Sequence, residues 1–207
     1  MPRVHTATRK RAVLKRPMTC RHCHEEIAVG QSYFTWQRRY GGPQYLHTTC
    51  RRPRPTELSD RKTAQIEEAV LDVVWPDATF DADDLTGCVE AYLSDLQTTV
   101  QDVAAVVREV GEEYQASYDN LPENFQYGAT GEAMESVAQE LESKADDLES
   151  WEPDSTEPDY PDEPGDEADE AEREEYVQAC ETAFSDWASD AQSNAEDAFG
   201  DMPEYEG

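Results

Sequence analysis

The sequence predicts a small α+β module at the N-terminus, followed by an all-α region that contains an antiparallel helical hairpin or coiled coil. Two pairs of Cys and His residues, on either side of a segment with β-hairpin character, predict the module. Apolar residues with heptad spacing over 84–118 predict the helical region. A proline-rich acidic stretch, 152–168, then separates a last amphipathic segment as a C-terminal helix.

The module spans residues 19–55 and contains the pairs Cys20-x-x-Cys23 and His47-x-x-Cys50. Two ligands this close in sequence can hold one ion from a tight turn, and the second pair completes a tetrahedron around Zn²⁺. Four protein ligands leave no open coordination position. The spacing therefore predicts one structural zinc ion with no catalytic role.

The elements of this module follow from local composition. Residues 1–18 are basic and show no periodicity, so we expect a flexible arm. Residues 31–38 are rich in β-favouring aromatic side chains and predict a strand. Gly41-Gly42 can supply the positive φ angles of a hairpin turn, and residues 44–47 form the returning strand.

The helical region is expected over residues 56–151. An amphipathic helix over 57–75 is predicted by a stripe of Ile66, Ala69, Val70, Val73 and Val74. The helix over 84–118 has an unbroken heptad seam of Val89, Leu93, Leu96, Val100, Val103, Val107, Val110 and Tyr114. A loop over 120–131 precedes a helix over 131–151, whose stripe is Met134, Val137, Leu141, Ala145, Leu148 and Trp151. Neither helix is stable alone, which favours a hairpin or a homo-oligomer through the seam.

Residues 152–168 alternate acidic side chains with proline, and we expect that nothing in them is buried and that they form a disordered linker. The segment 169–207 is an acidic C-terminal helix and tail, with the helix predicted over about 168–199. We expect this helix to dock on the hairpin or to bind a partner.

The run from Cys20 through Ile27 and Gly30, with an aromatic residue shortly before His47 and Cys50, resembles single treble-clef zinc fingers. The resemblance is to the poly(ADP-ribose) polymerase-type DNA-break fingers and to the first zinc site of LIM domains, and it covers about 35 residues. The whole chain also resembles uncharacterised zinc-finger proteins of phages and haloviruses, through the Tyr-x-x-Ser-x-x-Asn pattern from Tyr114 to Asn120. This resemblance implies a viral accessory protein.

Charge is distributed very unevenly along the 207 residues. Of 17 Lys and Arg residues, 14 lie at or before Lys62 against four acids, which gives that part +10. The remainder carries −40, and the chain as a whole carries −30. Such asymmetry indicates an interaction arm and a solvating tail. The scarcity of lysine beside abundant Asp and Glu is also typical of halophilic proteins, in which high salt screens the repulsion.

Aromatic and basic residues alternate in the finger, and they predict contacts to nucleic acid through Trp36, Arg38, Arg39, Tyr40, Arg51 and Arg52. Aromatic faces stack on bases and arginine neutralises phosphates. A protein partner and a purely structural role for these residues are alternatives, because one aromatic face of the strand must be inside. The acidic helices could likewise form a protein-interaction surface or mimic DNA, or could simply be a solvated halophilic surface.

The sequence favours a non-enzymatic protein. The nucleases built on treble clefs need a catalytic histidine on the hairpin, and apart from His47 the chain has only His5, His22 and His24. We expect no membrane partner, since the longest aliphatic run, 103–107, is far too short to cross a bilayer. The first 20 residues lack an apolar core of the kind that signal peptides have, so we expect a cytoplasmic protein, in the host cytoplasm if viral.

Overall fold

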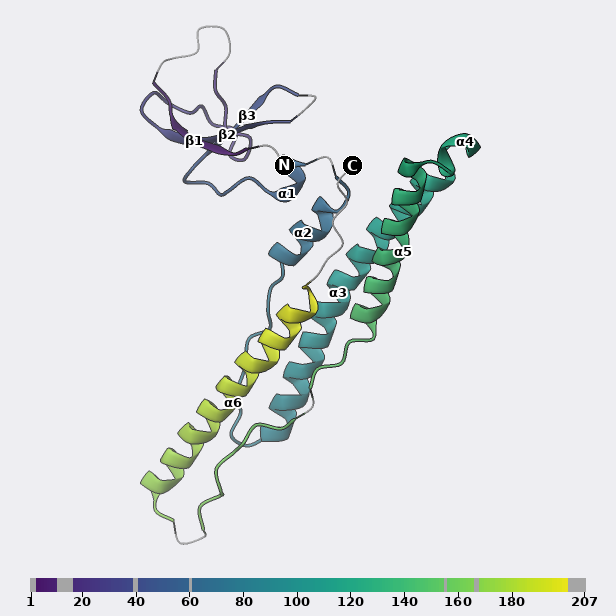
Figure 1. The fold of residues 1–207 in the computed structure, drawn as a ribbon. Coiled ribbons are helices and arrows are strands. Elements are labelled where there is room, and N and C mark those ends of the chain that lie inside the picture. The colour runs from purple at the N-terminus through teal and green to yellow at the C-terminus, as the bar shows by residue number, and fades with distance from the viewer. Residues whose placement is uncertain are drawn as a thin grey trace. The chain divides into compact units, whose positions relative to one another are not determined.

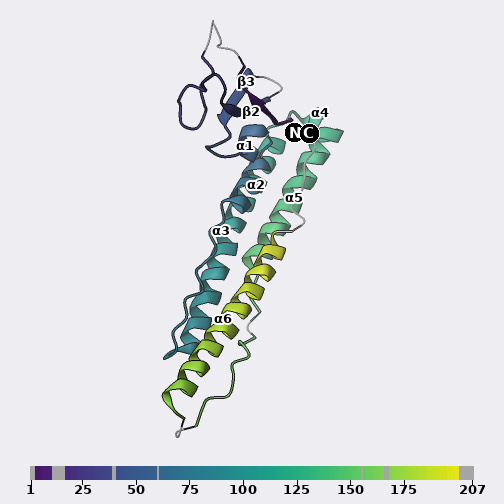
Figure 2. The same ribbon diagram turned by 90° about the vertical axis from the view of Figure 1, so that its left-hand side faces the viewer.

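The computed structural model describes residues 3–10, 17–38, 41–59, 61–154, 156–165 and 168–200. The chain divides into two compact units, Met1–Glu68 and Ala69–Glu206 (Figures 1 and 2). The division falls six residues after Lys62, the last residue of the basic run. The sign of the charge therefore changes close to the point at which one unit ends and the other begins.

The first unit contains a three-stranded antiparallel sheet with the order β1-β2-β3. Its strands are β1 (His5–Thr8), β2 (Ser32–Gln37) and β3 (Pro43–His47). Phe34 lies opposite Thr6 on one side and Leu46 on the other. The hairpin of β2 and β3 is the one that the sequence predicts.

Strand β1 differs from the expected flexible arm. The chain continues past the strand with regular pairing, because Arg9 N–H donates to Gln31 O at 2.9 Å and Gly30 N–H donates to Arg9 O at 2.7 Å. The Arg9 side chain is only 3% exposed, and its guanidinium binds the Ile27 carbonyl and the Glu26 carboxylate. The buried side chain that follows this strand is an arginine and not an apolar residue. The segment therefore lacks the hydrophobic alternation by which a strand is predicted from sequence.

The core of the first unit is small. Among the described residues, one cluster of five buried side chains forms its centre, and its members are Met18, Cys20, Ile27, Trp36 and Leu46. Ala64 and Ile66 are also buried in this unit. Partly buried side chains from both strands of the hairpin cover this cluster, together with Leu58. Domains of fewer than about 70 residues are only marginally stabilised by their apolar cores, so a further constraint such as a metal ion contributes much of their stability.

The predicted helix over 57–75 is two shorter helices, α1 (Pro55–Leu58) and α2 (Ala64–Leu71). A proline at the first position fixes the start of α1, and Ser59 ends it in an extended conformation. Ile66 is buried as expected, whereas Val74 lies beyond α2 and is 85% exposed. Helix α1 and most of α2 belong to the first unit, so the compact finger extends beyond residue 55.

The second unit is mostly helical and centres on α3 (Leu85–Asp119). The carboxylate of Asp84 caps this helix by accepting from Gly87 N–H at 2.9 Å. After the short α4 (Glu123–Gln126), helix α5 (Ala129–Glu149) returns antiparallel to α3 (Figure 1). The predicted loop over 120–131 thus contains a helical turn, and the hairpin that we expected from the two amphipathic stripes is present.

The heptad seam is the buried face of α3. All of its members are buried except Leu93, whose neighbour Tyr92 is buried in its place. On α5 the buried positions are Gly131, Val137, Ala138, Leu141, Ala145 and Leu148. Gly111 allows close approach of the two helices, because a Cβ atom there would lie 3.3 Å from Leu141 Cβ. None of the helices in the described residues combines the length and the apolar character needed to span a membrane.

Helix α6 (Glu170–Ala198) begins at a capping box formed by Asp169 and Glu172. It docks on the N-terminal part of α3, where the Tyr92 hydroxyl donates to Ala188 O at 3.1 Å. The rings of Phe184 and Trp187 lie against the same tyrosine. Of the two expectations for this helix, docking within the chain is the one that the structure shows.

The segment 152–168 forms no helix or strand in its described part. Contrary to the expectation that nothing in it is buried, Pro158 is buried and Thr156 O accepts from the Trp187 indole at 2.7 Å. Residues of this segment therefore contact α6. A side chain such as proline can be covered by a neighbouring helix even where the surrounding composition is strongly acidic.

Val103→Asp should destabilise the second unit by about 4 kcal/mol or more, because it places an unpaired charge in the seam. Val103 is only 3% exposed. Gln101→Asp is the matched control, since Gln101 is exposed on the same helix and gains the same charge. Thermal unfolding followed by circular dichroism at 222 nm measures both. Equal melting temperatures for the two variants would show that the seam is not a core.

Candidate metal centre

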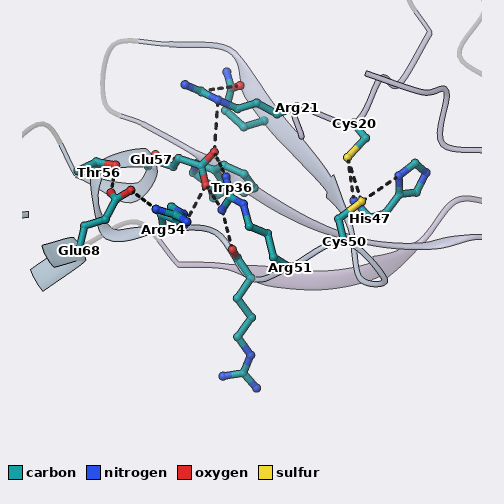
Figure 3. A network of polar contacts seen from close by, with 12 residues as sticks. Cys20, Arg21, Trp36, His47, Cys50, Arg51, Arg54, Thr56, Glu57 and Glu68 are labelled. Carbon is teal, nitrogen blue, oxygen red and sulfur yellow. Dashed lines mark hydrogen bonds and ion pairs between the residues drawn. The ribbon is translucent and has the colours of Figure 1, made fainter. Parts of the chain in front are cut away.

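Cys20, Cys23, His47 and Cys50 come together in the first unit, and their ligand atoms all lie within 4.8 Å of one another. A tight turn supplies the first pair, β3 ends at His47, and the turn that follows β3 supplies Cys50. Figure 3 shows the Cys20 sulfur directed toward the Cys50 sulfur, which in turn faces the His47 ring. The structure therefore brings together the four ligands that the sequence predicts.

The distances between these atoms fit one tetrahedral ion. Cys20 Sγ lies 3.9 Å from Cys50 Sγ, and His47 Nδ1 lies 3.4 Å from Cys23 Sγ and 3.9 Å from Cys50 Sγ. Zn–S bonds of about 2.3 Å and Zn–N bonds of about 2.0 Å give tetrahedron edges of about 3.8 Å and 3.6 Å. A disulfide would require a sulfur separation of about 2.05 Å. The cluster could therefore hold one metal ion, and its sulfur-rich ligand set suits zinc.

Main-chain hydrogen bonds fix the turn that carries Cys20. Cys20 N–H donates to Glu25 O at 2.8 Å, and Ile27 N–H donates to Met18 O at 2.7 Å. These bonds make the two sides of the turn a small antiparallel ladder. Arg21 N–H donates to Tyr45 O at 2.9 Å, which attaches the turn to β3. The two ligand pairs are thereby held at a fixed separation by backbone contacts alone.

The surroundings of the Cys20 sulfur stabilise its ionised form, the thiolate. It accepts hydrogen bonds from three backbone N–H groups, those of His22, Cys23 and His47. Burial alone would raise the pKa of this thiol, but the hydrogen bonds lower the pKa to about 6. The thiolate, not the thiol, is the form that binds a metal ion.

The pKa of the Cys50 thiol shifts in the opposite direction when no metal ion is bound. Burial and its hydrogen bonds to the neighbouring cysteines raise its pKa to about 11, and the negative charge of those cysteines adds to the effect. Three thiolates cannot share so small a space without a cation between them. A divalent ion removes that repulsion, so the metal and the ionised ligand set stabilise one another.

A second polar layer surrounds Glu57, which is 8% exposed (Figure 3). Arg51, the residue after ligand Cys50, donates to both carboxylate oxygens of Glu57 at 2.8 and 2.9 Å. The N–H of Arg54 donates to the same carboxylate at 2.9 Å, and Arg21 approaches it at 3.5 Å. Glu57 thus joins α1 to residues adjacent to both ligand pairs.

The backbone of α1 also accepts hydrogen bonds from the sheet. The Trp36 indole donates to Glu57 O at 2.9 Å, and the Arg38 guanidinium donates to the same oxygen at 2.8 Å. Farther along, Glu68 of α2 accepts from the Arg54 guanidinium at 2.8 Å and from the Thr56 hydroxyl. These bonds explain why α1 and the first residues of α2 are part of the finger.

The residues predicted to contact nucleic acid differ in how far the fold leaves them exposed. Trp36 is 2% exposed and belongs to the core, so we withdraw it as a stacking surface. Arg38 and Arg51 lie close together, with their guanidinium groups bound to α1. Arg52 is exposed. Arg39 and Tyr40 lie outside the described residues.

Sequence reasoning missed Glu57. It had one available signal: Glu57 is one of only four acids up to Lys62 in a segment with 14 bases. An isolated acid in so basic a segment has many potential partners, but Glu25 and Glu26 in the same segment are exposed, so the sequence alone could not single out Glu57.

The chain matches no protein-family model, and comparison with curated proteins and with solved structures finds none that is significantly similar to it. The resemblance to treble-clef fingers therefore depends on the ligand spacing and on the four-residue cluster.

Cys23→Ser should abolish metal binding and unfold the first unit, because three ligands are left and the core of five residues is small. Native protein should contain one zinc ion per chain by inductively coupled plasma mass spectrometry. Cys88→Ser is the control, since Cys88 lies on α3 in the second unit. A zinc content near zero in the native protein, or near two, would contradict the assignment.

Glu57→Gln should destabilise the zinc-loaded first unit by about 1–3 kcal/mol at pH 7, because buried arginine hydrogen bonds lose their charged acceptor. Burial acts to raise the pKa of Glu57, but Arg51 and the Arg54 N–H lower it overall. The carboxylate therefore contributes fully above about pH 4.3, the unfolded value, and loses its contribution as the pH falls through the lower folded pKa.

Chemical denaturation of wild type and variant at several pH values measures this difference, with Glu67→Gln on α2 as the matched control. The gap between wild type and Glu57→Gln should narrow below pH 4 at those pH values where both proteins still hold their zinc, because acid also protonates the cysteine ligands. The control should stay close to wild type over the same range. A gap that is unchanged by acid would show that the carboxylate charge is not responsible.

Proposed function

We propose that this protein is a non-enzymatic, zinc-stabilised nucleic-acid-binding factor that acts through its basic N-terminal unit. One observation carries the proposal. The compact unit Met1–Glu68 has 14 bases and six acids, a net +8, on a chain whose remaining residues carry −38. Such a local excess of positive charge in an acidic protein favours an anionic partner. Nucleic-acid backbones have a high density of negative charge and therefore fit this requirement.

The exposed bases are the groups available for phosphate contact. Four described bases of the unit are exposed, and they are Arg3, Lys10, Arg21 and Arg52. Arg9, Arg38 and Arg51 instead form hydrogen bonds within the fold. The proposed surface is therefore different from the aromatic strand face that the sequence suggested.

The same proposal includes the type of zinc finger, the packing of the helices and the origin of the protein. The ligand spacing supports a treble-clef zinc finger, and the antiparallel helices support a coiled-coil packing that could also mediate self-association. The excess of acids over the second unit supports a protein of high-salt surroundings, such as a phage or virus of a halophile, acting in the cytoplasm of its host.

A protein-interaction role is the second candidate, and one observation favours it. Two aromatic side chains are exposed next to each other at the tip of the helical hairpin, with Phe125 57% and Tyr127 76% exposed. They stand on a strongly acidic unit. A partner with a basic, apolar surface would fit this tip, and such a partner could be a nucleic-acid-binding protein that the acidic helices occupy as a DNA mimic.

Fluorescence anisotropy of the zinc-loaded full chain with single-stranded and duplex DNA and RNA tests the first candidate. Binding at about 50 mM salt should weaken steeply as the salt concentration rises. Replacing Arg3, Lys10 and Arg52 together by Gln should lower the slope of log K against log salt by about 2. Arg173→Gln, which removes a base from the acidic unit, should leave the slope unchanged. Absence of binding at low salt would contradict the proposal.

A further inference from the structure

A groove of about 320 Å³ lies beside the turn that carries the first ligand pair. Its walls come from the two sides of the finger, with Arg21 and His24 from the turn and Pro43, Gln44 and Tyr45 from β3. Pro17, Thr19 and the candidate ligand Cys20 complete the lining. Small-molecule sites have volumes from about 300 Å³ upward, so this groove is large enough for one planar ring system with its substituents.

His24 has an uncommon backbone conformation at the edge of this groove. Its φ angle is 61°, and it is the one residue other than glycine with positive φ in the described part of the chain. Glycine would adopt this conformation without steric cost. Residues in strained conformations gather at binding sites, where the side chain is needed. The imidazole of His24 is exposed, so it is available to a ligand.

Arg21 and Tyr45 line the same groove as His24, and both are held in place by contacts within the finger. The Arg21 guanidinium donates to Gln44 Oε1 at 3.2 Å, yet the side chain remains 47% exposed. The Tyr45 ring packs edge-on against Tyr33, with centroids 5.8 Å apart and planes at 75°. That contact fixes the orientation of the Tyr45 ring, which is partly buried against the core cluster and also lines the groove.

We propose that this groove binds one unpaired nucleotide of a single-stranded nucleic acid, with the base against Tyr45 and the phosphate at Arg21 and His24. This inference rests on the nucleic-acid binding proposed above. Aromatic rings stack on bases of any sequence, and arginine neutralises the adjoining phosphate. Bases inside a duplex are already stacked and cannot enter, so the groove makes the finger selective for single strands.

The test compares the affinities of the zinc-loaded full chain for a labelled single strand and for its duplex, with both DNA and RNA. Wild type should prefer the single strand. His24→Gly and Tyr45→Leu should each weaken single-strand binding about five- to tenfold, the range expected for a lost stacking or phosphate contact, and should leave duplex binding unchanged. Arg21→Gln removes an exposed base and should weaken binding of both forms, but binding of the single strand more than binding of the duplex. Arg52→Gln is the matched control for the charge of Arg21→Gln and should weaken both equally.

His24→Gly keeps the test decisive even if Arg21→Gln disturbs the fold, because glycine relieves the positive φ and should keep or raise the melting temperature. Zinc content measured for every variant shows that the finger is intact. Wild type that binds neither strand form would overturn the proposed function itself. Wild type that binds without single-strand preference, or groove variants that behave like Arg52→Gln, would overturn the groove assignment alone.

Discussion

Three thiols and one imidazole converge on a single point, and a metal ion bound there would hold the N-terminal unit together. The buried apolar cluster beside them has five residues, and one of these is Cys20 itself. Hydrophobic burial on that scale cannot offset the conformational entropy of about 60 ordered residues. The β-hairpin, the turn with the first ligand pair and the paired strand β1 would therefore depend on a metal ion in this cluster as much as on their own sequence preferences.

The Glu57 network extends this constraint beyond the cluster. Arg51 follows Cys50 directly, so fixing that cysteine also fixes the arginine that binds the buried carboxylate. Glu57 in turn orders α1, whose backbone accepts from Trp36 and Arg38. Trp36, Arg38 and Arg51, which the sequence offered as ligand contacts, thus form hydrogen bonds within the fold. The groove lined by Arg21 and Tyr45 instead presents polar groups to the solvent.

The features with a strict spacing were predictable from the sequence. Ligand pairs and the heptad seam follow fixed periods, so Cys20 to Cys50 and the α3–α5 hairpin were correctly placed. Features that depend on a contact between one residue and another far away in the sequence were not predictable. The burial of Arg9 and of Trp36 depends on contacts between segments far apart in the chain, which no local pattern records. The division of the helix over 57–75 instead follows from the extended conformation of Ser59, which the apolar stripe did not reveal.

Strand β1 has a consequence for the solubility of the protein. The central strand β2 reads Ser-Tyr-Phe-Thr-Trp-Gln, six residues with strong β propensity and no charge, proline or glycine. Segments of this kind assemble into cross-β aggregates when an edge is open. Pairing with β1 over His5–Thr8 occupies that edge. Loss of the first eight residues, by proteolysis or by truncation in expression, would turn β2 into an edge strand and make an otherwise highly charged protein prone to aggregate.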